Sequence, residues 1–281
     1  MLRLEVDGRS VERVIYVKDG RAETVAGDKI VLCGGSFHTP QLLMLSGIGP
    51  AEELERHGIQ VRHRLDGVGE NYQDHAMVFP TFEGRVDFQH DWGVSSPFRL
   101  LFKSDPNRPV PDFHIMIRPP TEVAGLKQTM PVSAALLEQR NRGRLSLQSA
   151  DIDDLPLVDA QMLDHPGDVE AVRAAMQFIH DLTQHDSMKD YYGPMLQPTT
   201  KEDWATFARS TFNSYAHASG TCMMGPTSNA MAVVDQNLRV HGMDNLWLAD
   251  ASIMPTVVHA NTNLTAIMIG ERLSDFLKQE G

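Results

Sequence analysis

Residues 29–40 read Lys29-Ile30-Val31-Leu32-Cys33-Gly34-Gly35-Ser36-Phe37-His38-Thr39-Pro40. The nearly continuous apolar run 29–33 predicts a strand buried on both faces, as in a parallel sheet. The two glycines end this strand, and Thr39-Pro40 predicts a helix start, with Thr39 as cap and Pro40 in the first turn. A strand, a glycine turn and a helix leave free backbone N–H groups where a ligand can lie. A tight turn without a ligand accounts for the same glycines equally well.

The segments on either side extend this unit. Upstream, β-prone runs alternate with Asp-Gly turns, which predicts an antiparallel meander. The runs are 2–6, 11–17 and 24–26, and the turns are Asp7-Gly8 and Asp19-Gly20. Downstream, residues 41–45 continue the predicted helix, and residues 51–57 predict a second short helix closed by Gly58.

The middle of the chain has short alternating runs from about residue 78 to 160, typical of an antiparallel sheet with one covered face. From Pro166 onward, apolar residues recur at helical spacing and predict an amphipathic helix. Residues 188–201 read as a loop, and a terminal helix is expected from Leu264. The fold class is therefore α/β, in the broad sense that includes α+β.

The composition limits the function classes. The 281 residues are 42% hydrophobic and 22% charged, with a net charge of −12, which argues against a nucleic-acid surface. No apolar run reaches the ~20 residues of a membrane span. Cys33 and Cys222 have no metal-ligand spacing and fit a reducing compartment, so we expect a cytoplasmic protein without a metal site.

The last third carries two polar motifs. Residues 214–221 read Ser-Tyr-Ala-His-Ala-Ser-Gly-Thr, and residues 259–263 read His-Ala-Asn-Thr-Asn. A histidine such as His217 can accept the proton of an alcohol, and an amide such as Asn261 can hold its oxygen. Taken alone, His217 fits a structural role better than a catalytic one, and Asn261 fits a turn or a helix cap.

Five blocks of the sequence, in order, resemble the glucose–methanol–choline (GMC) oxidoreductases, flavoenzymes that oxidise alcohols. The blocks are residues 34–50, 66–75, 143–147, 233–242 and the closing motifs 214–221 with 249–263. The chain is similar to their choline- and alcohol-dehydrogenase type. The resemblance implies a partial FAD-binding, glutathione-reductase-like domain and an antiparallel-sheet substrate domain. The expected boundaries are 1–77 for the first part of the FAD domain, 78–205 for the substrate domain, and 206–281 for a return to the FAD domain.

The resemblance also implies the roles of site residues. His217 matches the base that lies over the flavin, and Asn261 matches the second active-site position. The implied reaction is hydride transfer from a small alcohol to flavin N5. His259 is expected to be a surface or supporting residue, while His38, His75 and His241 are expected to be structural.

Four further positions are implied to contact the cofactor. Asp250 and Ala251 match the turn beside the ribityl–phosphate portion of FAD. The backbone of Thr262 and Asn263 matches the part that approaches the pyrimidine edge of the flavin ring. Cys222 is expected to pack in the core.

The glycine fingerprint of dinucleotide binding, GxGxxG after a strand, does not occur in the sequence. The chain therefore resembles the C-terminal portion of a GMC enzyme, and we expect it to bind FAD weakly or not at all by itself. Two alternatives stay open: a catalytically silent truncated protein, or half of a split enzyme that needs an N-terminal FAD-binding partner. A third is a non-redox family member such as a hydroxynitrile lyase.

Overall fold

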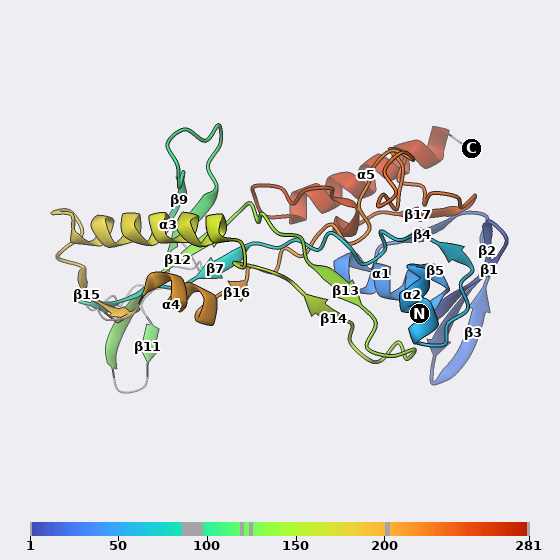
Figure 1. Ribbon diagram of the computed structural model, residues 1–281, viewed down its shortest axis with the longest axis horizontal. Coiled ribbons are helices and arrows are strands. Elements are labelled where there is room, and N and C mark those ends of the chain that lie inside the picture. Colours follow the sequence, from blue (N-terminus) through green and yellow to red (C-terminus); the bar gives the residue numbers. More distant parts are fainter. Residues whose placement is uncertain (1, 86–97, 119–120, 124–125, 200–202, 280–281) are drawn as a thin grey trace. The chain divides into compact units, whose positions relative to one another are not determined.

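The computed structural model describes all residues except 1, 86–97, 119–120, 124–125, 200–202 and 280–281 (Figure 1). The chain forms two compact units, each made of separate segments. The first unit contains residues 1–73, 142–161 and 217–281, and the second contains residues 74–141 and 162–216. Helices, a parallel strand pair and antiparallel sheets occur together, which confirms the predicted α/β class.

The first unit opens with the predicted antiparallel meander, which is confirmed. Strands β1 (Arg3–Asp7), β2 (Ser10–Lys18) and β3 (Arg21–Val25) pair in that order. Asp19 and Gly20 have φ of +50° and +74°, the left-handed values that a two-residue hairpin turn requires. The register of β2 against β3 is therefore set by local turn chemistry.

Strand β4 (Ile30–Leu32) pairs in parallel with β17 (Leu246–Leu248), as the apolar run predicted. The expected burial on both faces was wrong. Leu32 is buried, but Val31 is 36% exposed. Strand β17 is the neighbour of β4 among the described residues, so one edge of β4 and part of its surface face solvent.

Helix α1 (Gly35–Leu45) begins before Thr39, so the expectation that Thr39 and Pro40 start the helix was wrong. Pro40 lies inside the helix, where it has no N–H to donate to the Ser36 carbonyl one turn earlier. The Thr221 hydroxyl donates to this carbonyl at 2.8 Å instead. A side chain from a distant segment thus supplies the hydrogen bond that the proline removes.

The rest of the first unit surrounds one hydrophobic core, built from α1, β17 and the segments next to them. Residues 142–161 group with this unit, although the sequence assigned them to the middle domain. Leu145 N–H donates to Gly69 O at 2.7 Å, which fixes this hairpin to the first unit. The remaining elements are β5 (Ile48–Gly49), α2 (Ala51–Arg56), β6 (His63–Arg64), β13 (Arg144–Ser146), β14 (Leu157–Asp159), η1 (Ala251–Ile253) and α5 (Asn263–Gln279).

The second unit contains an eight-stranded antiparallel sheet with the order β15-β8-β12-β10-β9, to which β7, β11 and β16 attach. Residues 188–201, expected to be a loop, include strand β15 at the sheet edge. The strands are β7 (Ala76–Val78), β8 (Thr81–Gly84), β9 (Phe98–Phe102), β10 (Phe113–Ile117), β11 (Thr121–Val123), β12 (Leu126–Leu136), β15 (Tyr192–Gln197) and β16 (Asn213–Ser214), and the helices are α3 (Pro166–Gln184) and α4 (Trp204–Thr211).

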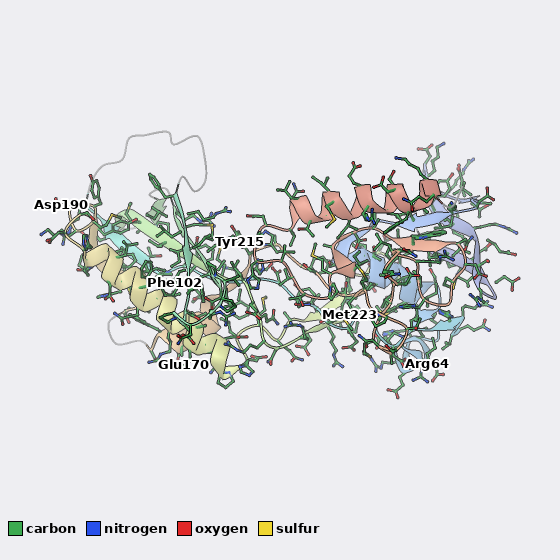
Figure 2. All side chains as sticks on the ribbon, turned by 90° about the horizontal axis from the view of Figure 1, so that it is seen from above. Arg64, Phe102, Glu170, Asp190, Tyr215 and Met223 are labelled. Atoms are coloured by element: carbon green, nitrogen blue, oxygen red, sulfur yellow. The ribbon has the colours of Figure 1, made fainter. Side chains whose placement is uncertain are left out.

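Helix α3 confirms the predicted amphipathic helix and packs along the sheet (Figure 1). Its buried face carries Val169, Val172, Met176 and Ile179, the residues at helical spacing. Phe178 stacks on Phe102 of β9 with ring centroids 4.7 Å apart, and Figure 2 shows Phe102 beside this helix. Among the described residues, none of the helices has the length and apolar character that a bilayer crossing needs.

Candidate active site

The two residues expected to act on a substrate lie together in the first unit. Asn261 Nδ2 is 3.2 Å from His217 Nε2, although 44 positions separate these residues in the sequence. The His217 side chain is 7% exposed, while Asn261 is exposed. The pair therefore has a sheltered imidazole and an amide at the surface.

This geometry gives the pair a defined hydrogen-bonding character. With the amide nitrogen facing the ring, Asn261 donates and His217 Nε2 accepts, which assigns the proton of a neutral imidazole to Nδ1. The pair thus offers one proton acceptor and one N–H donor at the same point. A base of this kind can accept the proton of a hydroxyl, and the N–H donor can stabilise the negative charge that develops on its oxygen.

Local backbone contacts set the direction of His217. Ala216, the preceding residue, has φ of +62°, a left-handed value that is uncommon outside glycine. Its N–H donates to Ser214 Oγ at 2.8 Å, which supports this conformation. After the histidine, Ser219 Oγ donates to His217 O at 2.7 Å, and Ser36 Oγ donates to Ala218 O at 2.8 Å. The carbonyls around His217 are therefore fixed by serine hydroxyls.

Asp250 and Ala251, expected at the cofactor, follow β17: Asp250 caps η1, and Ala251 is the first residue of η1. Asp250 is 7% exposed, and its carboxylate accepts from Gly35 N, Thr39 Oγ1 and Ser252 N at 3.0, 2.7 and 2.8 Å. The start of α1, expected to offer free N–H groups, already has a carboxylate beside it. A phosphate at this helix end would meet the negative charge of Asp250.

Thr262 and Asn263 lie at the start of α5, as the sequence predicted for the last helix. Thr262 O accepts from Ala266 N at 2.9 Å, which makes Thr262 the residue before the first turn. Asn263 is exposed, and Leu264 is 77% exposed. The first N–H groups of a helix have no acceptor within it, so this exposed end can donate to a ligand.

The other histidines have separate surroundings. His259 is half-buried, and no hydrogen bond connects it with the His217–Asn261 pair among the described residues. His38 Nδ1 lies 3.0 Å from Gln41 Oε1, and His241 Nε2 lies 2.9 Å from Gly225 O. In the described ranges, no group of three or more histidine, cysteine or acidic residues is placed to hold a metal ion.

Both cysteines are free, and their environments differ. Cys222 is buried, and its burial raises the pKa of the thiol well above the usual value, with the Asp250 charge acting in the same direction. Cys33 is exposed, and partial desolvation with the same charge raises its pKa as well. Both thiols therefore stay protonated at neutral pH, and Cys222 lies in the core as expected.

Sequence reasoning did not single out the buried polar residues around the pair. Gln73, Ser36 and Thr221 are all buried, and each bonds to the backbone of a distant segment. Their partners lie far away in sequence, so no local pattern indicates these roles. The one available signal is position, because all three residues occur within the blocks that carry the family resemblance.

Two sequence models, both described as GMC oxidoreductase, match this chain: the N-terminal one at residues 8–77 and the C-terminal one at residues 139–270. Mitochondrial choline dehydrogenase of Homo sapiens is 31% identical over 313 residues, which cover 98% of this chain and 52% of the relative. The chain thus spans about half the length of the curated relatives it matches.

Solved structures show the same fold. Pyridoxine 4-oxidase from Mesorbium loti superposes with a TM-score of 0.89 at 24% identity, covering 98% of this chain and 56% of that protein. A formate oxidase variant from Aspergillus oryzae RIB40 gives 0.86 at 23% identity, covering 99% and 59%. The matched segments, the relative and the shared fold lead to one assignment: the chain belongs to the GMC oxidoreductase family.

Proposed function

We propose that this chain provides the substrate-activating part of an FAD-dependent oxidoreductase that acts on the CH–OH group of a small alcohol. The contact between His217 and Asn261 carries the proposal, because it joins a proton acceptor and an N–H donor at one point. The family, and the choline dehydrogenase named among the relatives, support alcohols as the substrate class.

The described residues suit the flavin end of FAD better than its phosphates. The exposed first turn of α5, after Thr262, can donate N–H groups to an electron-rich ring edge. Asp250 has three donors on its carboxylate, which leaves room for one hydroxyl donor, and its negative charge disfavours a phosphate nearby. We therefore expect Ala251 and Asp250 to lie beside the ribityl chain, with Thr262 and Asn263 at the pyrimidine edge.

The chemistry divides between the cofactor and the protein. FAD, when bound, supplies the acceptor for the hydride that leaves the alcohol carbon. When the substrate hydroxyl replaces the hydrogen bond between the two side chains, His217 Nε2 accepts the hydroxyl proton, which frees the oxygen electrons to form the carbonyl. Asn261 Nδ2–H donates to the oxygen while negative charge develops on it. The low exposure of His217 keeps bulk water from competing for the proton.

A second candidate is that the chain acts only with a further polypeptide segment that holds the dinucleotide, or is silent without it. The open side of β4 favours this reading. Cavities of about 480 and 410 Å³ flank it, lined in part by Leu32 and Cys33 in one case and by Val31 and Cys33 in the other. Parallel sheets are normally covered on both faces. An upstream or adjacent reading frame that encodes the glycine fingerprint would favour an active enzyme. The absence of such a reading frame would favour a catalytically silent remnant.

The test uses the FAD-loaded protein that contains this chain, mixed without oxygen with a panel of alcohols that starts with choline. We expect the flavin to bleach, and His217→Ala to slow its reduction by roughly 10²–10⁴-fold. His259→Ala is the matched control and should leave the rate nearly unchanged. Unchanged reduction in His217→Ala would overturn the assignment. For the 281-residue chain purified by itself, stoichiometric yellow flavin would contradict the expected weak binding.

A further inference from the structure

Gln73 is a buried amide whose hydrogen-bonding groups all contact backbone. The side chain is 1% exposed, and burying an amide without partners costs on the order of 1–3 kcal/mol. Its Nε2 donates to Pro255 O at 3.1 Å and to Asn71 O at 3.3 Å. Its Oε1 accepts from Val257 N at 3.2 Å. Both ends of the amide therefore hold the loop that follows η1.

The backbone of Gln73 reaches the other side of the site. Gln73 N donates to Ser219 O at 3.0 Å, and Ser219 N donates to Gln73 O at 2.9 Å, which closes an antiparallel bridge. Ser219 also fixes the histidine directly, since its hydroxyl donates to His217 O at 2.7 Å. The main chain of Gln73 thus holds the segment that carries His217.

The loop that Gln73 holds leads directly to Asn261. Residues 254–262 connect η1 with α5 and contain no helix or strand. Two backbone groups of this loop, Val257 N and Pro255 O, bond to the Gln73 amide, and Pro255 O also accepts from Asn71 Nδ2 at 3.3 Å. The loop positions the amide of Asn261 through these anchor points.

We propose that Gln73 is a positioning residue that sets the separation between His217 and Asn261, with its backbone on one side and its side chain on the other. It touches neither group, so it acts through the two segments. This inference rests on the proposed function for its catalytic meaning. The geometric claim concerns the apo chain and can be tested without flavin or alcohol.

The test observes the His217 imidazole by long-range ¹H–¹⁵N correlation in the 281-residue chain, with His217→Gln to identify its signals. Asn261→Ala provides the reference shift for loss of the amide partner. We expect Gln73→Met to move the His217 signals in the same direction and by a comparable amount. Gln41→Met is the matched control, because Gln41 is equally buried and clamps Ile152 O and Asp154 O in the same unit.

Two outcomes would overturn the inference: unchanged His217 signals in Gln73→Met, or an equal shift in Gln41→Met. If Gln73→Met does not fold, hydrogen exchange in the unmodified chain decides. Val257 N–H should then exchange about tenfold or more slowly than an unprotected loop amide, because Gln73 Oε1 accepts it. Unprotected exchange at Val257 counts against the clamp. A failed alcohol assay would refute the proposed function and leave these apo readouts intact.

Discussion

Replacing Gly220 by alanine perturbs the backbone fit beside the candidate site. Gly220 has φ of +91°, which residues with a Cβ atom rarely adopt. A Cβ there would lie 2.4 Å from Asn71 O and 2.9 Å from both Asn71 Nδ2 and Gln73 Nε2. The nearest of these atoms is backbone, so the neighbouring segment has to move. That segment includes Gln73, which holds the loop of Asn261.

The magnitude follows from a comparison with Gly58. Gly58 also has a left-handed φ, +69°, but a Cβ there would meet nothing within 4 Å. An alanine in this region costs about 1–2 kcal/mol, less about 0.4–1 kcal/mol because the unfolded chain also becomes stiffer. Gly58→Ala should therefore cost about 1 kcal/mol. Gly220→Ala adds an overpacking cost of about 1–3 kcal/mol, for a total of roughly 2–4 kcal/mol.

The assay has to report on the first unit alone, because a chain with two units need not unfold in one step. Trp247 is buried in the first unit, so a background of Trp92→Phe and Trp204→Phe leaves its fluorescence as the probe. Urea unfolding then gives the free energy of unfolding of this unit for both glycine variants.

We expect the midpoint of Gly220→Ala to fall clearly below that of Gly58→Ala. Equal losses would show that the left-handed backbone alone accounts for the effect. The close approach to Asn71 would then have no energetic weight, and the reasoning would fail.

Three further predictions concern single groups. Thr221→Val should lower the free energy of unfolding by about 1–3 kcal/mol, because it leaves Ser36 O without its hydrogen bond. The loss should be smaller in a Pro40→Ala background, where the alanine N–H can donate to Ser36 O. A double-mutant cycle that shows no coupling between the two positions would contradict this. A disulfide-exchange reagent at neutral pH should titrate Cys33 in the folded chain and Cys222 only after unfolding; equal rates in the folded chain would refute the burial argument. Burial raises the pKa of Tyr192 to about 12, so the neutral phenol contributes stability that is fully present below pH 10 and is lost as the pH rises through 12. Urea unfolding at alkaline pH should show a loss of roughly 3 kcal/mol in the free energy of unfolding. The Tyr192→Phe variant should lack this loss.

The parts of the fold that sequence predicted are those set by local chemistry. The meander follows from Asp19-Gly20, whose left-handed turn joins neighbouring strands. The helix from Pro166 follows from apolar spacing, and its cap is equally local, because His165 Nδ1 accepts from Gly167 N at 3.0 Å. In both cases the interacting groups lie within a few residues of one another, so a short stretch of sequence is enough to predict the element.

The errors arise where distant residues decide. Helix α1 starts at Gly35 because the Asp250 carboxylate accepts its N–H from 215 positions away, and local reading selected Thr39 instead. The strand Tyr192–Gln197 contains glycine and proline and pairs with β8, more than a hundred residues earlier. The solvent exposure of Val31 depends on which segments pair with β4 and cover it, and the apolar run by itself does not specify those segments.

For the candidate site, the sequence indicated two side chains that the structure brings together, but it did not indicate the framework around them. His217 and Asn261 came from motif resemblance, and the structure brings their side chains to 3.2 Å. Nothing in the sequence indicated that Gln73 spans the two segments, because its partners are backbone atoms of residues 219, 255 and 257. Backbone acceptors are the same at every position, so they leave no residue signature.

The buried polar residues of the first unit that bond to backbone atoms differ in role from the two residues of the candidate site. Loops without a strand ladder still have to satisfy their buried carbonyls and N–H groups, and side chains such as Ser36, Gln73 and Thr221 do so. The donor hydrogens of these side chains are committed to backbone carbonyls. The contact between His217 and Asn261 is of another kind, since each side chain presents a functional group to the other rather than to a carbonyl. In the proposed function these two side chains meet the substrate, so substitutions at the framework residues should act on the reaction only through geometry.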